Sequence, residues 1–457
     1  MKKVGFISLG CPKNLVDSEV MMGLLQQNGY VLTPQADEAE VLVVNTCSFI
    51  ESARRESIDT ILEMAELKKS GKAQRLIVAG CMVERHRAEI QAEIPEVDAL
   101  VGLNELESIL GVCADAPAAP AALLPVLPAD FFDVRPTAPY LYDHLTPRLL
   151  ATPKYSAYIK IAEGCDLPCT FCIIPTFRGK FRSRRFESVI AEAERLAANG
   201  VREITLIGQT TTSYGEDLGL KDGLSQLLER LAAIDGLTWI RTLYCYPNRV
   251  TPRLLETIAA HPRLCKYIDM PLQHASAAVL KRMKRGGSAD IFLKLLERIR
   301  ATIPGVSLRT TFILGFPGET EADFEELCAF VREAKFDWLG SFPYSDEDRS
   351  QSFQLDAKVP AAVIRRRQRA LMALQRPISR LRQRSLLGRR LPILIEGPAA
   401  ESDLLWQGRL ASQAPDIDGK VLLTEFPEDV APEVGSFGTV EITGAQDYDL
   451  LGRLVEV

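Results

Sequence analysis

The chain has 457 residues, more than one hydrophobic core usually holds, so two or three domains are expected. Its composition, 47% hydrophobic and 25% charged, is that of a soluble globular protein, and no apolar run is long enough to predict a membrane-spanning helix. The start lacks a signal-peptide pattern, so the ten cysteines indicate buried thiols or metal ligands in a reducing cytosol, and the net charge of -6 gives no overall attraction to nucleic acid or anionic membranes.

Three apolar runs in the first third of the chain are typical of buried parallel strands. The runs span residues 4–10, 41–47 and 75–81. Cys11 directly follows the first run, and Cys47 and Cys81 are the last residues of the second and third. In an open α/β sheet ligands bind at the carboxyl ends of the strands, so we predict that the three cysteines converge there on a metal cluster. Unrelated core cysteines are the alternative, because cysteine is often buried.

Proline is dense between residues 114 and 150, where it excludes regular helix and sheet. We interpret this segment as a linker between a domain at 1–113 and a domain that begins at 151. Its aromatic residues Phe131, Phe132 and Tyr140 are expected to pack against a neighbouring domain.

A second cysteine trio lies in the stretch 163–175, where Cys165, Cys169 and Cys172 have the spacing C-x3-C-x2-C. Iron–sulfur clusters are normally held by four cysteines, so a trio with no fourth ligand nearby leaves one iron open for chemistry. A zinc knuckle is the alternative. Zinc needs four tight ligands, however, and the candidate histidines His144 and His274 are distant in the sequence.

Six apolar runs alternate with helical patterns after residue 151, which predicts a parallel sheet. They span residues 158–162, 203–208, 239–245, 267–272, 308–315 and 338–344. The cysteine loop follows the first run, Gly208 ends the second with Gln209 directly after it, and Gly315 ends the fifth. Barrels of parallel strands carry their active sites at the carboxyl ends of the strands, where these residues would lie.

Two stretches near the end of the chain have opposite charge. Residues 357–395 contain ten arginines and no acidic residue, which suits an anion-binding helix or an arginine-rich solvated face. From Glu396 onward thirteen acidic residues stand against three basic ones, a formal charge of 3 − 13 = −10. Short apolar runs with Gly and Asp turns predict a small antiparallel β-barrel, with strands at 392–396, 404–410, 420–425 and 438–442.

The trio at Cys165, Cys169 and Cys172 resembles the signature of radical S-adenosylmethionine (SAM) enzymes, and the order of parts resembles the methylthiotransferase family over essentially the whole chain. The resemblance implies an α/β fold of three parts. These are an open parallel α/β domain (1–113), a radical SAM (β/α)6 partial barrel (151–383) and a small β-barrel called TRAM, which holds the substrate (384–457).

The resemblance also implies two [4Fe-4S] clusters, a radical SAM cluster on Cys165, Cys169 and Cys172 and an auxiliary cluster on Cys11, Cys47 and Cys81. It places SAM contacts at Phe171, Gly208, Gln209 and Gly315. In this family one SAM methylates sulfur attached to the auxiliary cluster. A second SAM yields the radical that opens a substrate C–H bond, and the carbon then takes the methylthio group.

The family has two substrate classes, an adenosine beside the tRNA anticodon and the β-carbon of an aspartate in small-subunit ribosomal protein S-12. The stretch 8–19, which contains Cys11-Pro12, resembles the ribosomal-protein branch, since the tRNA branch usually has glutamine after that cysteine. A barrel of charge −10 would also repel phosphates and complement a basic protein. The arginine-rich helix is the observation that favours RNA.

We therefore expect a cytosolic monomer that acts on ribosomal protein S-12, free or within the small ribosomal subunit, with a reducing electron donor as a partner and no membrane. A non-catalytic iron–sulfur factor that binds the ribosome is an alternative. The glycine patterns at 207–210 and 311–319 count against it. A plain SAM-dependent methyltransferase would need neither cysteine trio.

Overall fold

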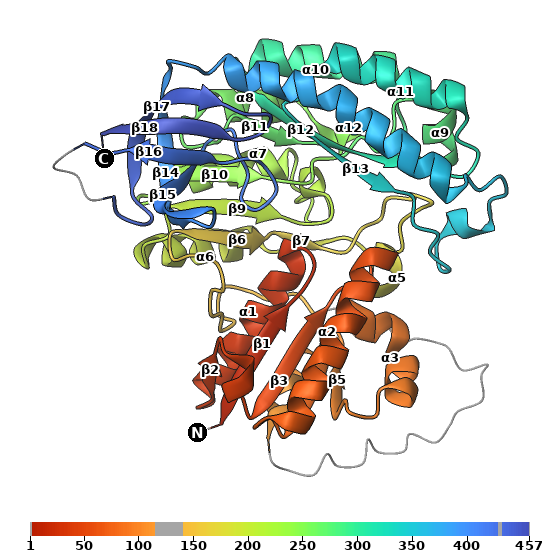
Figure 1. Cartoon of the computed structure of the whole chain (residues 1–457), viewed down its shortest axis with the longest axis vertical. Coiled ribbons are helices and arrows are strands. Elements are labelled where there is room, and N and C mark those ends of the chain that lie inside the picture. The colour runs from red at the N-terminus through yellow and green to blue at the C-terminus, as the bar shows by residue number, and fades with distance from the viewer. Residues whose placement is uncertain (1, 115–139, 428–431, 457) are drawn as a thin grey trace. The chain divides into compact units, whose positions relative to one another are not determined.

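The computed structural model describes residues 2–114, 140–427 and 432–456, and its contacts divide the chain into two units (Figure 1). The first unit comprises Met1–Pro153, Ala162–Asp166 and Ile173–Val189, and the second comprises the remainder. The loop with Cys165, Cys169 and Cys172 is therefore shared between the two units. Phe131 and Phe132 of the expected linker lie outside the described residues. None of the described helices is long and apolar enough to cross a membrane.

The first unit contains a five-stranded parallel sheet in the order β2-β1-β3-β4-β5. Strands β3 and β4 are apolar along most of their length because helices cover both faces of such a sheet. Strands β2 and β5 have three residues each, too few to show a period in the sequence. The elements are β1 (Lys3–Ser8), α1 (Pro12–Gln27), β2 (Val31–Thr33), β3 (Val41–Thr46), α2 (Glu51–Ser70), β4 (Arg75–Gly80), α3 (Cys81–Glu93), β5 (Ala99–Val101), α4 (Ile109–Cys113), β7 (Ala162–Glu163), α5 (Ile174–Arg178) and β8 (Arg182–Ser183).

The second unit contains the six strands that the central apolar runs predicted. They form two parallel ladders, β6-β9-β10 and β11-β12-β13. An isolated bridge pairs Ile240 of β10 with Leu264, three residues before β11, and the Cys245 N–H donates to the Asp269 carbonyl of β11 over 2.9 Å. The elements are β6 (Ser156–Lys160), α6 (Phe186–Ala198, whose first turn belongs to the first unit), β9 (Glu203–Ile207), α7 (Gly223–Ala232), β10 (Trp239–Thr242), α8 (Pro252–Ala260), β11 (Tyr267–Asp269), α9 (Ala277–Arg282), α10 (Ala289–Thr302), β12 (Ser307–Leu314), α11 (Glu321–Ala334), β13 (Trp338–Pro343) and α12 (Ala361–Arg384).

A closed five-stranded barrel ends the chain, in the order β14-β15-β16-β18-β17. It differs from the expected antiparallel barrel at one pair, because β16 and β18 run parallel. Strand β18 was not predicted, since Gly452 and Arg453 interrupt its apolar run, yet it closes the barrel around a core that includes Ile393, Val421 and Leu454. The strands are β14 (Arg390–Ala399), β15 (Ser402–Leu410), β16 (Val421–Glu425), β17 (Phe437–Ala445) and β18 (Leu450–Glu456).

The C-terminal barrel docks at the amino ends of the central strands. Arg409 of β15 forms a buried ion pair over 2.6 Å with Glu203, the first residue of β9. Tyr267, the first residue of β11, donates to Asp418 over 2.6 Å, and Trp338, the first residue of β13, donates to the Ser412 carbonyl over 2.9 Å. The carboxyl ends of these strands, where the cysteine loop and the expected SAM contacts lie in the sequence, are therefore the opposite ends from this barrel.

Candidate functional site

The structure brings Cys11, Cys47 and Cys81 to the carboxyl ends of three neighbouring strands. Cys11 precedes α1, Cys47 follows β3, and Cys81 begins α3 directly after β4. A Cβ atom built on Gly10 would lie 2.6 Å from the Cβ and 3.0 Å from the Sγ of Cys47, so the loops of Cys11 and Cys47 touch. The three thiols are also close enough for the charge of one to raise the pKa of the others at Cys47 and Cys81.

Buried polar side chains hold these loops in place. The Asn14 amide donates to the Leu9 carbonyl over 2.7 Å, and the Asn45 amide donates to the Asn14 carbonyl over 2.8 Å and to Ser18 Oγ over 2.7 Å. Ser57 Oγ accepts from the backbone N–H of Cys47 over 3.0 Å and donates to its carbonyl over 2.8 Å. These residues have structural partners, and their role is to position the thiols.

Two glycines allow the backbone to approach closely behind the cysteines. Gly10 and Gly80 have φ of +86° and +93°, in the left-handed region that favours glycine. A Cβ on Gly80 would lie 2.2 Å from Asn45 Oδ1 and 2.7 Å from the Thr46 carbonyl. A side chain at either position would push the loops apart, so the space beside the three thiols depends on both glycines.

Arg178 is a site residue that sequence reasoning missed. Its side chain is 3% exposed, and its Nη2 atom donates to Cys81 Sγ over 3.4 Å. It also forms ion pairs with Asp17 over 3.1 Å and with Glu163 over 3.0 Å. Arg178 ends α5, six residues after Cys172, and an arginine at that place carries no recognisable signal in one sequence.

The surroundings shift the pKa values of the three thiols in different directions. Desolvation raises the pKa of Cys11, but the charges of Lys13 and Arg178 outweigh it and the net pKa lies below the usual value. Burial raises the pKa of Cys47, and it raises the pKa of Cys81 to about 12 although Arg178 opposes this shift. Binding a metal requires deprotonated thiols, and a buried guanidinium offsets part of the charge that three thiolates would bring.

The donor set fits an iron–sulfur cluster, because thiolates are its normal ligands. Among the described residues, no three His, Cys, Asp or Glu side chains converge closely enough to hold a single metal ion. A four-iron cluster is wider, since its thiolates bind different irons. The soft donors, the glycine-lined loops and the compensating arginine agree with a group of that kind at Cys11, Cys47 and Cys81.

The second trio lies in the loop that the two units share, and each part is anchored within its own unit. In the first unit the Cys165 N–H donates to the Gly179 carbonyl over 3.1 Å. In the second unit the Cys172 N–H donates to the Cys169 carbonyl over 3.1 Å, and Arg285 Nη1 donates to Cys169 Sγ over 3.4 Å. Arg285 is buried and lies over the ring of Tyr246. Each cysteine trio thus has one buried arginine in contact with a sulfur.

The expected SAM contacts lie at the carboxyl ends of two central strands. Gly208 and Gln209 follow β9 directly, and Gly315, with φ of +79°, follows β12. Phe171 lies between Cys169 and Cys172 and is partly exposed. The structure thus places the glycine segments at the same ends of the strands as the cysteine loop, which follows β6.

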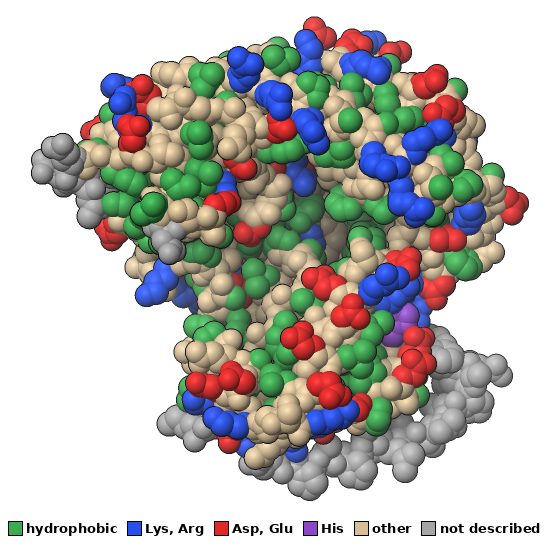
Figure 2. Space-filling model, in the orientation of Figure 1, with side chains coloured by type: hydrophobic (Ala, Val, Ile, Leu, Met, Phe, Trp, Pro, Cys, Tyr) green, Lys and Arg blue, Asp and Glu red, His purple; other side chains and the backbone are tan. Residues whose placement is uncertain are grey.

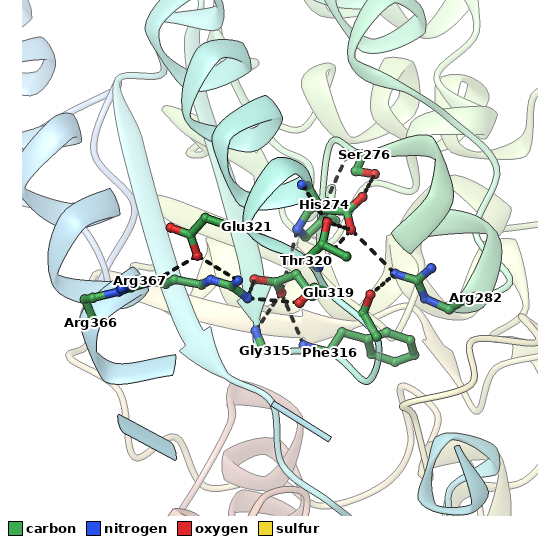
Figure 3. Close-up of polar contacts among 12 residues, drawn as sticks. His274, Ser276, Arg282, Gly315, Phe316, Glu319, Thr320, Glu321, Arg366 and Arg367 are labelled. Carbon is green, nitrogen blue, oxygen red and sulfur yellow. Dashed lines mark hydrogen bonds and ion pairs between the residues drawn. The ribbon is translucent and has the colours of Figure 1, made fainter. Parts of the chain in front are cut away.

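Glu319 shapes the loop that carries Gly315 (Figure 3). Its buried carboxylate accepts from the N–H groups of Gly315 over 2.6 Å and Phe316 over 3.2 Å, and from Arg367 Nη1 over 2.7 Å. Burial raises the pKa of Glu319, and the hydrogen bonds from Gly315 and Arg367 oppose this. Arg367 belongs to the arginine-rich helix α12. At least one arginine of this helix therefore has a structural role, because it holds the loop that follows β12.

Two non-glycine residues at the same ends have left-handed backbones. Tyr244, after β10, has φ of 61°, and Gln273, after β11, has φ of 72°. The Asp269 carboxylate holds the first of them by accepting from the Tyr244 N–H over 2.9 Å. Such conformations cost free energy. Five other described residues share them, Asp222, Lys284, Lys335, Ala357 and Asp416, so a left-handed backbone does not by itself mark a functional face.

Comparison with protein families divides the chain into three matches. Residues 3–102 match the uncharacterized protein family UPF0004, residues 159–331 match the radical SAM superfamily, and residues 387–455 match the TRAM domain. The radical SAM match runs from the end of β6 into α11 and leaves out β13, the last of the six central strands, and the TRAM match covers the C-terminal barrel.

Curated relatives cover the whole chain. It is 62% identical over 455 residues to the ribosomal protein uS12 methylthiotransferase RimO of Solibacter usitatus, with 99% of this chain and 95% of the relative aligned. It is 57% identical to the protein of the same name from Koribacter versatilis, with 99% and 96% aligned.

A solved structure has a similar fold. The radical SAM methyltransferase TsrM from Kitasatospora setae aligns with a TM-score of 0.52 and 14% identity over 75% of this chain and 73% of TsrM. At that identity the likeness concerns the fold alone.

Proposed function

Because this chain belongs to the family of ribosomal protein uS12 methylthiotransferases, we propose that it is a radical SAM enzyme that inserts a methylthio group at the β-carbon of an aspartate in uS12, the S-12 protein. The observation that carries this proposal is the 62% identity over 99% of the chain to a relative of that name. The Cys11-Pro12 sequence after β1 and the two cysteine trios support it independently.

Two [4Fe-4S] clusters and SAM are the cofactors that we propose. Cys165, Cys169 and Cys172 would hold the radical SAM cluster, and Cys11, Cys47 and Cys81 the auxiliary cluster. When bound, these groups supply the radical that opens the C–H bond and the methylated sulfur that replaces the hydrogen. Phe171, Gly208, Gln209 and Gly315 are the SAM contacts that we propose.

The protein's own residues would compensate the charge of these groups and order their binding loops. Arg178 and Arg285 each place a buried positive charge against a cysteine sulfur, which offsets the negative charge of the thiolates. Glu319 and Arg367 fix the loop at Gly315, so the SAM site would be ordered before SAM binds. This division assigns cofactor chemistry to residues 1–113 and 151–383, and the TRAM domain at 384–457 would contact the substrate.

The acidic charge of the TRAM domain is only partly available to a substrate. Asp418 and Glu396 contact Tyr267 and Arg409 within the second unit, and Asp416 accepts from Tyr158 over 3.2 Å. Asp447 pairs with Arg380 of α12. Glu401, Glu425 and Glu441 form ion pairs with Lys420 or Arg453 of the same domain. At least seven of the thirteen acidic residues are therefore used internally, and the charge that a basic protein would meet is smaller than the formal −10.

The test is a competition assay under strict anoxia, with reconstituted enzyme, SAM, sulfide and a reductant. Both uS12 and a tRNA anticodon stem-loop are offered, and mass spectrometry locates any methylthio group. We expect it on an aspartate of uS12. Modification of the RNA alone would replace the protein substrate with a tRNA adenosine. Binding to the ribosome without modification of either substrate would favour a non-catalytic factor.

The second cluster has its own test. Replacing Cys11, Cys47 and Cys81 by alanine should halve the iron content of the reconstituted protein while reductive SAM cleavage persists. The matched control replaces Cys113, Cys245 and Cys328, which are buried and belong to neither trio. Its iron content should equal that of the wild type. Unchanged iron in the first variant would remove the auxiliary cluster from the proposal.

A further inference from the structure

Helix α12 presents a line of arginines to solvent. It has 24 residues and is therefore about 36 Å long. At about 100° per residue, six exposed arginines fall within about 100° of one another around its axis. One of them, Arg366, pairs with Glu321 over 2.8 Å. We call the other five the arginine stripe: Arg365, Arg369, Arg376, Arg380 and Arg384. Lys and Arg side chains gather over α12 in the space-filling view (Figure 2).

Most of this charge is not neutralised. Among the described residues, Arg365, Arg369 and Arg384 have no ion-pair partner, and neither has the exposed Arg389 just after the helix. Arg376 and Arg380 share one carboxylate, Asp447, over 3.6 Å in the first case and a shorter distance in the second. The stripe is thus strongly basic on a chain whose net charge is -6.

The remaining arginines of the helix have different roles. Arg367 is 4% exposed and pairs with Glu319, which holds the Gly315 loop. Arg382 pairs with Asp337 over 2.6 Å. Arg367 and Arg382 therefore stabilise the packing of α12. Packing does not explain the solvent-exposed arginines of the stripe.

The two ends of the stripe lie beside two different parts of the second unit. Near the amino end of α12, Ile364 packs on Gly315, at the carboxyl end of β12. Near the other end, Arg380 pairs with Asp447, in the loop between β17 and β18 of the TRAM domain. A partner bound along the stripe would reach from the functional ends of the strands to the TRAM domain.

We propose that the arginine stripe binds the phosphate backbone of a structured RNA. Arginine presents a planar fork of N–H donors that matches phosphate oxygens, and phosphate contacts need no base sequence. Exposed alanines lie between Arg369 and Arg376, at positions 370 and 373, and would let a backbone approach the helix.

An acidic electron-transfer protein is the other anionic partner that this chemistry could accept. Electron-transfer encounters use small interfaces. A stripe that runs the length of a helix of about 36 Å fits a continuous row of phosphates better.

This inference rests on the proposed function and deepens it, because it names the form of the substrate. A free ribosomal protein is basic and would be repelled by the stripe. The same protein within the small ribosomal subunit is surrounded by RNA, and the stripe would dock that RNA while uS12 reaches the carboxyl ends of the strands. We therefore infer that the assembled subunit is the preferred substrate.

The first experiment measures binding to a fluorescein-labelled RNA duplex of 24 base pairs by anisotropy at several salt concentrations. The stripe variant, R365Q/R369Q/R384Q/R389Q in the holoenzyme, removes the three arginines of the stripe that have no ion-pair partner in the described part of the chain, together with the neighbouring Arg389. A matched control, K221Q/R230Q/K294Q/R298Q, removes the same number of exposed charges from the region of α7 and from α10. The stripe variant should bind at least tenfold more weakly, and its slope of log affinity against log salt should fall by about three. The control should bind like the wild type.

The second experiment compares methylthiolation of free uS12 and of purified small ribosomal subunits by the same three proteins. The stripe variant should slow modification of the subunits at least tenfold and should not slow modification of free uS12. Equal loss on both substrates, or none on either, would overturn the role in subunit docking even if the duplex result holds.

Three further outcomes separate the ideas. An unchanged duplex affinity and salt slope would overturn the RNA surface. An unchanged duplex affinity together with slower reduction by flavodoxin would assign the stripe to an acidic electron donor. Absence of methylthiolation of uS12 in any form by the wild type would overturn the proposed function, while the duplex measurement would still decide whether the stripe binds RNA.

Discussion

The guanidinium of Arg178 donates to the sulfur of Cys81 over 3.4 Å from a position where almost no solvent reaches it. The same guanidinium also pairs with the carboxylates of Asp17 and Glu163. A cluster bound at Cys81 would therefore share one positive charge with two carboxylates. The same relationship recurs between Arg285 and Cys169.

These two arginines allow the two sites to be disturbed separately. Arg178→Lys keeps the charge but loses the planar fork that contacts Cys81, Asp17 and Glu163 together. We expect it to lose up to half of the iron during a chelator challenge after anaerobic reconstitution, with reductive SAM cleavage retained. Iron analysis and visible absorption measure the first result, and formation of 5'-deoxyadenosine measures the second.

Arg285→Lys is the matched variant at the other trio. It should impair SAM cleavage while iron retained at Cys11, Cys47 and Cys81 stays at the wild-type level. If both variants produced the same defect, the arginines would serve only the general stability of the fold. Arg178→Gln is less informative, since it leaves two buried carboxylates without their cation at a cost of about 3–5 kcal/mol.

Gly80→Ala should destabilise the first unit. The new Cβ would lie 2.2 Å from Asn45 Oδ1 at a φ of +93°, so steric overlap adds to backbone strain. Gly29→Ala is the control, because Gly29 has φ of +84° and nothing within 4 Å of the new Cβ. We expect a loss of about 1 kcal/mol for Gly29→Ala and at least twice that for Gly80→Ala. Urea denaturation measures the free energy of unfolding of both variants. Equal losses would show that the residues around Asn45 shift to make room for the new Cβ.

Glu319→Gln should weaken SAM binding. The neutral side chain loses the ion pair with Arg367 and part of its hold on the Gly315 and Phe316 N–H groups. Loss of a buried charged hydrogen bond costs about 1.5–3 kcal/mol, which corresponds to at least a tenfold rise in the dissociation constant. Equilibrium dialysis with labelled SAM measures this.

Glu321→Gln is the control for that experiment. Glu321 pairs with the same Arg367 over 3.0 Å but is 52% exposed, so its contribution is small. Its dissociation constant for SAM should stay within about twofold of the wild type. A similar weakening in both variants would place the effect in Arg367 and not in the Gly315 loop.

His274 should make the protein sensitive to acid. Burial lowers the pKa of His274 to about 3, and the charges of Arg282 and Arg367 add to this while Asp323 opposes it. The Glu319 carboxylate lies 3.8 Å away (Figure 3). The unfolded chain takes up this proton near pH 6.5, so below that pH the unfolded state gains about 1.4 kcal/mol per pH unit relative to the folded state.

His274→Asn removes this titration and offers Oδ1 to the Ser276 N–H, which now donates to His274 Nδ1 over 3.0 Å. Its free energy of unfolding should depend less on pH between 6.5 and 4 than that of the wild type. Urea denaturation at each pH measures both slopes. Parallel slopes would show that His274 is protonated in the folded state.

Much of the fold could be predicted from the sequence because its strands are long, apolar and bounded by turns. The runs that became β3, β4, β9 and β12 are of this kind, and their cysteines and glycines stand at fixed offsets from the strand ends. The missed strands are β2, β5, β7 and β8, which have two or three residues each and are too short to show a period, and β18, in which Gly452 and Arg453 interrupt the apolar pattern. The parallel pairing of β16 and β18 needs closure of the whole barrel, and no local pattern encodes it.

Long-range contacts explain what the sequence could not indicate about the site. Arg178 lies 97 residues from Cys81, Arg285 lies 116 residues from Cys169, and Arg367 lies 48 residues from Glu319. A charge on a buried side chain acquires its role from partners that only folding brings near, whereas cysteine spacing is a local property.

The sequence by itself determined the order of the parts, the two cysteine trios and the family. Residue spacing and strand periodicity are local properties, so they can be recognised without the tertiary structure. Only the tertiary structure decided which arginines of residues 365–390 are structural and which face solvent, since that depends on what packs against α12. It also decided that the acidic TRAM domain docks at the amino ends of the central strands and uses part of its charge there. The distribution of charge over a surface is a property of the fold, and net charge along the chain does not predict it.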